Sequence, residues 1–256
     1  MSAVTLTARR VLPPLVGFGS FVLILVAVEI LIRAGAINRF IVPPPSEVAA
    51  SFGRVIAEEN IWRRFAFTAW ECFAAGVLLT VFGGLIGALL HRVRVLRLAC
   101  ETWVAAMASA PLVLLYPLFL VMFGRNALTI IMMAFISGLA PVILKTIEGL
   151  SSTRRVLLNV GRSFKLTPSQ QFWKILFPSA LPAIFVGIRL GLIFALINVV
   201  GVEFLINFGG LGQLINERAE RYDLPGTYAA ICFVVLVSVV FFAATERAER
   251  WLRSAG

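Results

Sequence analysis

The chain has 256 residues, of which 60% are hydrophobic and only 14% are charged, and its mean hydropathy is +0.94. Soluble domains are usually about 45–50% apolar and about 25% charged. This composition excludes a disordered protein, a disulfide-stapled secreted domain and an ordinary cytosolic enzyme, and it indicates a protein with several membrane spans. The net charge of +10 would point to nucleic acid in a soluble chain, but here we attribute it to Arg and Lys side chains that orient the spans.

Six stretches are apolar over enough residues to cross the hydrocarbon of a bilayer, which needs about 20. They are residues 15–32, 68–90, 101–123, 127–147, 183–206 and 228–246. The third holds Pro111 and Pro117, so we expect it to be kinked or broken where neighbouring helices can satisfy the freed carbonyls. The sequence therefore predicts an all-α membrane protein with six transmembrane helices in a single domain over residues 1–256.

Residues 39–64, between the first and second spans, are mixed in polarity. The run Val42–Pro43–Pro44–Pro45–Ser46 predicts a stiff extended turn that leads into a helix start. Apolar residues follow at helical spacing, at Val48, Phe52, Val55 and Ile56. The pattern predicts an amphipathic helix that lies on the membrane surface.

The distribution of basic residues predicts the orientation of the spans. With the N-terminus in the cytoplasm, 14 Arg and Lys residues fall in the inner segments and 8 in the outer segments. Because cytoplasmic segments carry the excess of basic residues, both termini are expected inside.

The sequence lacks the residues of common catalytic and nucleotide-binding sites. None of its three lysines, Lys145, Lys165 and Lys174, follows a glycine, so the chain has no P-loop. A single histidine, His91, cannot form an H-E-x-x-H zinc site, and no G-x-S-x-G elbow is present. We therefore expect no catalytic residue, metal or cofactor in this chain and disfavour a membrane-embedded enzyme. If ATP drives its function, ATP and Mg²⁺ must bind to another polypeptide.

The longest inner loop, residues 148–182, carries most of the functional information. It combines a short basic helix (residues 156–164), a break at Thr167–Pro168 and a second amphipathic piece (residues 170–177). A solvated helix–break–helix between two spans is typical of a docking element. The alternative is a plain connector, although connectors are usually shorter.

The end of this loop resembles the cytoplasmic "EAA" loop of permease subunits of bacterial binding-protein-dependent ABC importers. That motif reads E-A-A, three residues, G, nine residues, then I-x-L-P. Ile175–Leu176–Phe177–Pro178 matches its end except at Phe177. Asn159–Val160–Gly161 then fall on E-A-A and Lys165 on the glycine, so the frame and the proline are kept while the acid and the glycine are replaced.

Further motifs resemble the nitrate/sulfonate/taurine group of these permeases. The segments Ala180–Leu181–Pro182, Gly187–Ile188–Arg189–Leu190, Val202–Glu203–Phe204 and Gly209–Gly210–Leu211–Gly212 are similar to its A-L-P, G-x-R-[LV], A-E-x and G-[LI]-G series. One departure is Glu71, because the corresponding place in the group commonly holds Arg. The order and spacing of the motifs extend the resemblance over nearly the whole chain.

The resemblance implies a type I importer permease that moves a small anionic or polar solute across the bacterial cytoplasmic (inner) membrane. It implies a second permease copy as a homodimer partner, two cytoplasmic ATPases that bind ATP and Mg²⁺, and an extracytoplasmic binding protein. That protein is expected on the outer loops 33–64 and 207–226. The alternative function is a stand-alone secondary transporter or channel, which needs none of these protein partners.

In this family the EAA loop forms a coupling helix that docks on the ATPase. The residues that carry this expectation are Asn159, Val160, Gly161, Arg162, Ser163, Phe164, Lys165 and Leu166. Val160 and Phe164 are four residues apart on one helix face and are expected to be apolar anchors, unless they pack on the permease itself. The small residue at Gly161 would let the helix seat against the ATPase.

Three polar residues of the fifth span are candidates for the translocation path or its gate, since polar groups inside a bilayer are costly and usually functional. Arg189 is either a gate or a structural anchor, and Glu203 either lines the path mouth or caps a neighbouring loop. These two lie 14 residues apart, about 21 Å along a helix, so they cannot pair with each other. Asn198 is expected to face protein or the path rather than lipid.

Overall fold

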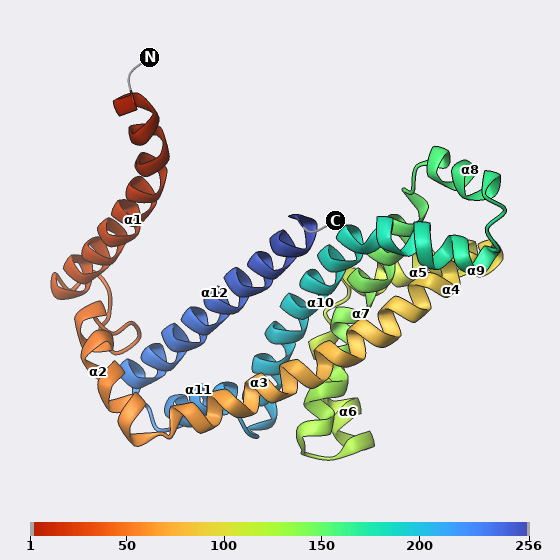
Figure 1. Cartoon of the computed structure of the whole chain (residues 1–256). Coiled ribbons are helices and arrows are strands. Elements are labelled where there is room, and N and C mark those ends of the chain that lie inside the picture. Colours follow the sequence, from red (N-terminus) through yellow and green to blue (C-terminus); the bar gives the residue numbers. More distant parts are fainter. Residues whose placement is uncertain (1–2, 255–256) are drawn as a thin grey trace. The chain divides into compact units, whose positions relative to one another are not determined.

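A computed structural model describes the backbone of residues 3–254 and the side chains of residues 15–250. Every regular element in this range is a helix (Figure 1). The α-helices are α1 (Ala3–Arg33), α2 (Pro45–Glu58), α3 (Ile61–Leu78), α4 (Gly84–Arg92), α5 (Arg94–Ser109), α6 (Tyr116–Phe123), α7 (Ala127–Ser151), α8 (Arg155–Ser163), α9 (Pro168–Gln171), α10 (Phe177–Ile206), α11 (Leu211–Glu220) and α12 (Leu224–Ser254). Two π-helical turns, η1 (Leu79–Gly83) and η3 (Phe172–Leu176), and one 3₁₀ turn, η2 (Leu112–Leu115), complete the chain.

The chain divides into two compact units, which are described separately. The smaller unit consists of the residues up to 61 together with 217–233, and the larger unit of residues 62–216 together with those from 234 onwards.

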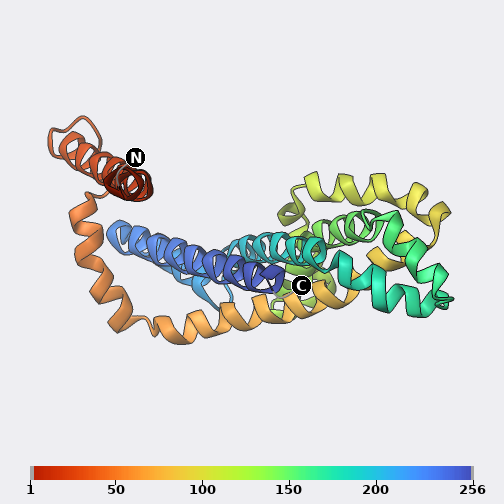
Figure 2. The same ribbon diagram turned by 45° about the horizontal axis from the view of Figure 1, so that its top comes forward.

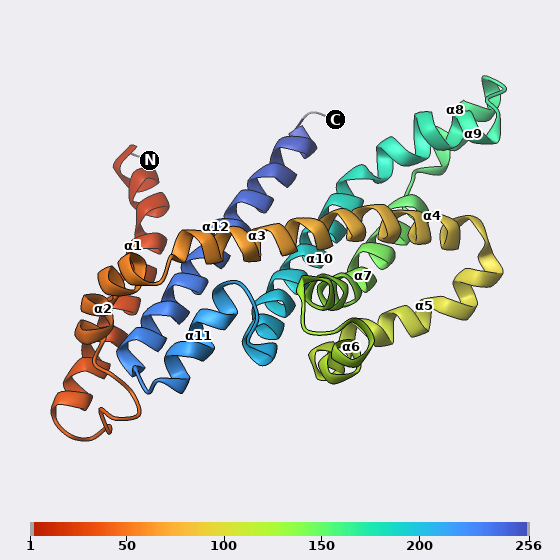
Figure 3. The same ribbon diagram turned by 90° about the horizontal axis from the view of Figure 1, so that it is seen from below.

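The predicted spans are present among the described residues. Five helical stretches are long and apolar enough to cross a membrane: Leu15–Arg33, Ile61–Arg92, Ala127–Ser151, Pro168–Glu220 and Leu224–Arg250. A bent pair, Arg94–Ser109 with Leu112–Phe123, supplies the sixth and turns by 91° (Figure 3). The bend falls at Ala110, whose ψ of 137° is extended because a residue before proline avoids the helical region. The expected break in the third span is confirmed.

The core of the larger unit forms where α7 packs along α10 (Figure 1). A Cβ atom on Gly138 of α7 would lie 2.4 Å from the carbonyl oxygen of Gly191 on α10, so the two backbones approach closely only because both residues are glycines. The helices α4 and α5 also pack against α7, and Figure 2 shows α5 running beside it. This arrangement fixes the end of α7 from which the predicted coupling loop leaves.

The predicted coupling loop and the fifth span are joined by a continuous helix. We expected the loop to reach residue 182, but the chain is helical without interruption from Pro168 to Ile206. A capping box starts this helix, with the Thr167 hydroxyl accepting from the Gln170 N–H and the Gln170 side chain accepting from the Thr167 N–H. The π-helical turn η3 then precedes Pro178, and Phe177 N–H donates to Phe172 O, five residues back. The wider turn lets the helix continue into a proline that would otherwise end it.

In the smaller unit, the helix predicted after Val42 is present as α2, with Pro45 in its first turn and Val55 buried. Its C-terminal end is tied to α11 by Arg218, whose guanidinium lies 2.6 Å from Glu59 and 2.7 Å from Asp223. Arg54 of α2 reaches Asp223 at 3.2 Å. These ion pairs bring together the two segments in which docking of a binding protein was expected.

Candidate functional site

The predicted coupling segment forms a compact hairpin that projects from the end of α7 (Figure 1). Its base is closed by a hydrogen bond of 2.7 Å between the hydroxyls of Thr153 and Ser179. Halfway along, the Gln171 side-chain amide donates to Leu158 O at 2.9 Å. These bonds hold α8 against α9 and η3, so α8 is a fixed part of the larger unit.

The C-terminal end of α8 explains one feature of the motif. Leu166 N–H donates to Gly161 O at 3.1 Å and Lys165 N–H donates to Arg162 O at 2.8 Å, which is the hydrogen-bond pattern of a Schellman cap. Lys165 has a φ of 53° in the left-handed region, which glycine adopts most easily. The motif places glycine at this position, and here a lysine adopts the left-handed conformation.

Gly161 faces the interior of the hairpin. It is buried, and a Cβ atom on it would lie 2.6 Å from Ile175 Cδ1 of η3. The expectation that its small size serves contact with the ATPase therefore differs from the structure. Gly161 lets α8 pack against the helix that leads into the fifth span.

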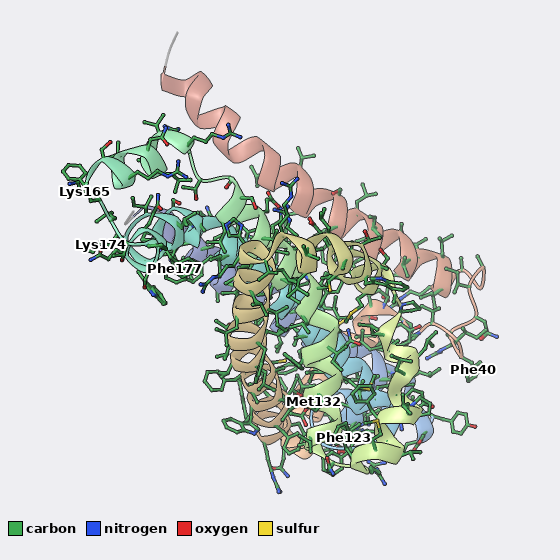
Figure 4. The ribbon with its side chains drawn as sticks, turned by 90° about the vertical axis from the view of Figure 1, so that its right-hand side faces the viewer. Phe40, Phe123, Met132, Lys165, Lys174 and Phe177 are labelled. Carbon is green, nitrogen blue, oxygen red and sulfur yellow. The ribbon has the colours of Figure 1, made fainter. Side chains whose placement is uncertain are left out.

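Another face of α8 carries an exposed apolar stripe, formed by Val156, Val160 and Phe164 at successive intervals of four residues. Their exposed fractions are 68%, 47% and 77%. Arg162 and Lys165 are exposed beside them, and Figure 4 shows Lys165 at the tip of the hairpin. Val160 is half-exposed and Phe164 is largely exposed in the described part of the chain. The stripe is an apolar surface with a basic border.

A cavity of about 610 Å³ lies beside the hairpin, between the end of α4 and the α9–η3 segment. Arg92 lines it on one side, and Phe172 and Trp173 on the other. The α4–α5 turn is itself tied to the end of α7, because Arg97 donates to the Ser151 hydroxyl at 2.9 Å. The α4–α5 turn and the C-terminal end of α7 therefore lie at one end of the unit.

Arg189 is paired rather than free. Its guanidinium lies 2.8 Å from the Glu249 carboxylate of α12 and 5.4 Å from the centroid of the Phe242 ring. The structure thus supports the anchor role among the two alternatives, because the charge is neutralised within the chain.

Asn198 donates its side-chain amide to Phe194 O at 3.0 Å, one turn back in α10. Its side-chain oxygen is buried and has no hydrogen-bond partner in the part of the chain that the structure describes. The residue is half-buried in α10, between Arg189 and Glu203 along the helix.

Glu203 holds the turn between α10 and α11. Its carboxylate accepts from the Thr68 hydroxyl of α3 and from the Gly212 N–H, both at 2.7 Å. Thr68 in turn accepts from the Leu211 N–H at 2.9 Å. A Cβ atom on Gly210 would collide with Glu203 Oε1, so glycine is required there. The structure therefore supports the loop-capping alternative for Glu203.

Sequence reasoning missed two groups of charged residues. It noted Glu71 only as a departure from the family pattern, yet this side chain is fully buried next to Glu203. It treated Arg218 as one of the outer basic residues, yet that side chain is buried among acids. In the first case the sequence carried a signal, because Glu71 departs from the residue that the resemblance led us to expect.

Residues 80–254 match the family described as binding-protein-dependent transport system inner membrane component. The riboflavin transport system permease protein RibX of Chloroflexus aurantiacus is 25% identical over 213 residues, which are 83% of this chain and 80% of RibX. The taurine transport system permease protein TauC of Escherichia coli is 21% identical over 221 residues, which are 84% of this chain and 80% of TauC. The fold is similar to that of a chain of the inward-facing MetNI methionine ABC transporter, with a TM-score of 0.64 at 20% identity over 77% of this chain and 99% of that chain.

The chain belongs to this family of binding-protein-dependent inner membrane components. It is a permease subunit of an ABC importer and a multi-pass protein of the inner membrane. The resemblance noted on the motifs of residues 159–212 is confirmed.

Proposed function

We propose that this permease moves a small polar or anionic solute into the cytoplasm. The relatives support this class of solute, since one is named for riboflavin transport and another for taurine transport. We further propose that the subunit works as a homodimer with both termini in the cytoplasm. The binding protein would dock on the surface where Arg218 joins the end of α2 to α11.

We assign α8 as the docking site for the ATPase partner. The single observation that carries this proposal is the exposed stripe of Val156, Val160 and Phe164 on a rigid helix. An apolar stripe with basic neighbours fits a groove with an apolar floor and acidic edges, where charge complementarity directs encounter and apolar burial holds the complex. A short helix fixed at its base transmits a rigid-body movement to the spans. ATP and Mg²⁺ bind to that partner, which performs the hydrolysis.

The test is co-purification of the permease with its ATPase, followed by ATP-dependent solute uptake in proteoliposomes with the binding protein. Phe164→Ser should reduce ATPase capture at least tenfold and abolish uptake, while the thermal stability of the isolated permease stays unchanged. The matched control is Phe40→Ser, which removes an equally exposed phenylalanine (83%) on the loop before α2. It should leave ATPase capture unchanged. Normal capture with Phe164→Ser, or solute uptake without any ATPase, would favour a stand-alone transporter.

A further inference from the structure

Two glutamates meet inside the larger unit, Glu71 from α3 and Glu203 from α10. Both side chains have an exposed fraction of 0%. Thr68 and Glu71 lie three residues apart, on the same face of α3. The hydrogen bond from Thr68 to Glu203 therefore brings the Glu71 carboxyl next to the Glu203 carboxylate.

The two carboxyls differ in their partners. The Glu203 oxygens accept hydrogen bonds from Thr68 and Gly212. Neither oxygen of Glu71 has a hydrogen-bond donor in the described part of the chain. Cys72, the residue after Glu71 on α3, belongs to the apolar core of the larger unit together with Ala75 and Ile206. A buried carboxyl without a donor is costly when it is charged, and a second charge beside it raises the cost.

No basic side chain in the described part of the chain neutralises the pair. Within the described residues, neither carboxyl has an Arg, Lys or His partner at ion-pair distance. The basic group that reaches this end of α10 is Arg125, and its guanidinium donates to the carbonyls of Ile206 and Asn207. Cys72 is the other titratable side chain that faces the pair. The neighbouring polar residues of α7 bond elsewhere, as Thr129 donates to Gly124 O.

We propose that Glu71 and Glu203 bind one proton between them, and that this shared proton holds the α10–α11 turn against α3. Glu71 carries the proton and donates its O–H to Glu203, which gives Glu71 the hydrogen-bond partner that it otherwise lacks. Glu203 remains the acceptor for Thr68 and for the first turn of α11. The proton is taken from water and forms an O–H bond on Glu71, and no other covalent bond changes.

The direct test is infrared spectroscopy of the full-length permease in lipid nanodiscs at neutral pH. The wild type should show the C=O stretching band of a protonated carboxyl shielded from water, shifted in deuterated buffer. Glu71→Gln should lose this band, because the amide keeps a donor for Glu203 without a proton to titrate. The control Glu101→Gln removes an exposed carboxyl that pairs with Arg97 and should keep the band. A wild type without the band, or a band that persists in Glu71→Gln, would overturn the proposal.

Two further measurements keep the outcome decisive. If the Glu71→Gln variant does not insert into the membrane, Glu71→Arg is used instead, because it offers Glu203 a guanidinium. This folded variant should also lack the C=O band of the protonated carboxyl. A bound monovalent cation could replace the proton, so thermal stability is compared in sodium, potassium and choline salts at one ionic strength. Stability should be the same in all three. A large loss in choline alone would show that the pair holds a metal cation, and the proton proposal would then be rejected.

Discussion

The guanidinium of Arg189 in α10 lies 2.8 Å from the carboxylate of Glu249 in α12. Both side chains are largely removed from solvent, and the Phe242 ring lies beside the guanidinium. The ion pair joins the fifth and sixth spans of the larger unit.

Arg189→Gln and Glu249→Gln should therefore have the same effect. Each removes one partner of the pair and leaves the other charge poorly solvated, which should cost about 2 kcal/mol of stability. The double variant should lose less than the sum of the two single losses, as measured by denaturant unfolding in detergent. If Arg189→Gln lowers uptake without loss of stability while Glu249→Gln has no effect, Arg189 acts on the solute path instead.

Lys165→Gly should stabilise the hairpin. A non-glycine residue in the left-handed region costs about 1 kcal/mol, and glycine removes this cost at the cap of α8. Hydrogen exchange at residues 164–166 should slow by several-fold, with ATPase capture retained. Lys165→Val is the opposing control, because a β-branched residue is disfavoured at this φ. Slower exchange in Lys165→Val than in Lys165→Gly would contradict the assignment.

Gly161→Glu should uncouple transport by loosening the hairpin. The added side chain meets Ile175, and a charge would be forced between α8 and η3. We expect faster hydrogen exchange throughout α8, loss of ATPase capture and a normal level of protein in the membrane. Gly161→Ala should show a milder effect that Ile175→Val relieves, since the contact is with the tip of a flexible side chain. A lack of relief in the double variant would argue against this packing role.

Asp223 should make a pH-dependent contribution to the smaller unit. Burial alone would raise the pKa of its carboxyl, but the Gly226 N–H together with the guanidinium groups of Arg218 and Arg54 holds the pKa below its ordinary value of 3.8. A lowered pKa stabilises the folded state above pH 3.8, and the contribution is lost as the pH falls through the lowered value.

The measurement is the stability difference between wild type and Asp223→Asn as a function of pH. It should be constant from neutral pH down to about 4 and shrink below that value. Asp223→Ala should cost about 1 kcal/mol more, because Asp223 also caps α12 through the Gly226 N–H at 3.1 Å. A difference that shrinks already at neutral pH would contradict the ion-pair account.

Hydropathy and proline content were sufficient to predict the spans, the broken third span and the helix α2, because these depend on local composition. The continuous helix through Pro178 was not predictable, since it depends on the π-helical turn that precedes the proline. The inward position of Gly161 depends on Ile175, fourteen residues later, and no helical periodicity connects the two. Glu71 and Glu203 lie 132 residues apart in the sequence, on different helices. The sequence could therefore show only that an acid at position 71 was unusual.

The most direct measurement for the assignment of α8 is photo-crosslinking from position 164. A photoreactive phenylalanine analogue replaces Phe164 in the assembled transporter, and Phe40 carries the same analogue as the control. The account predicts that position 164 crosslinks to the ATPase subunit and that position 40 does not. Crosslinks from position 164 to the permease alone, or to no protein, would contradict the account.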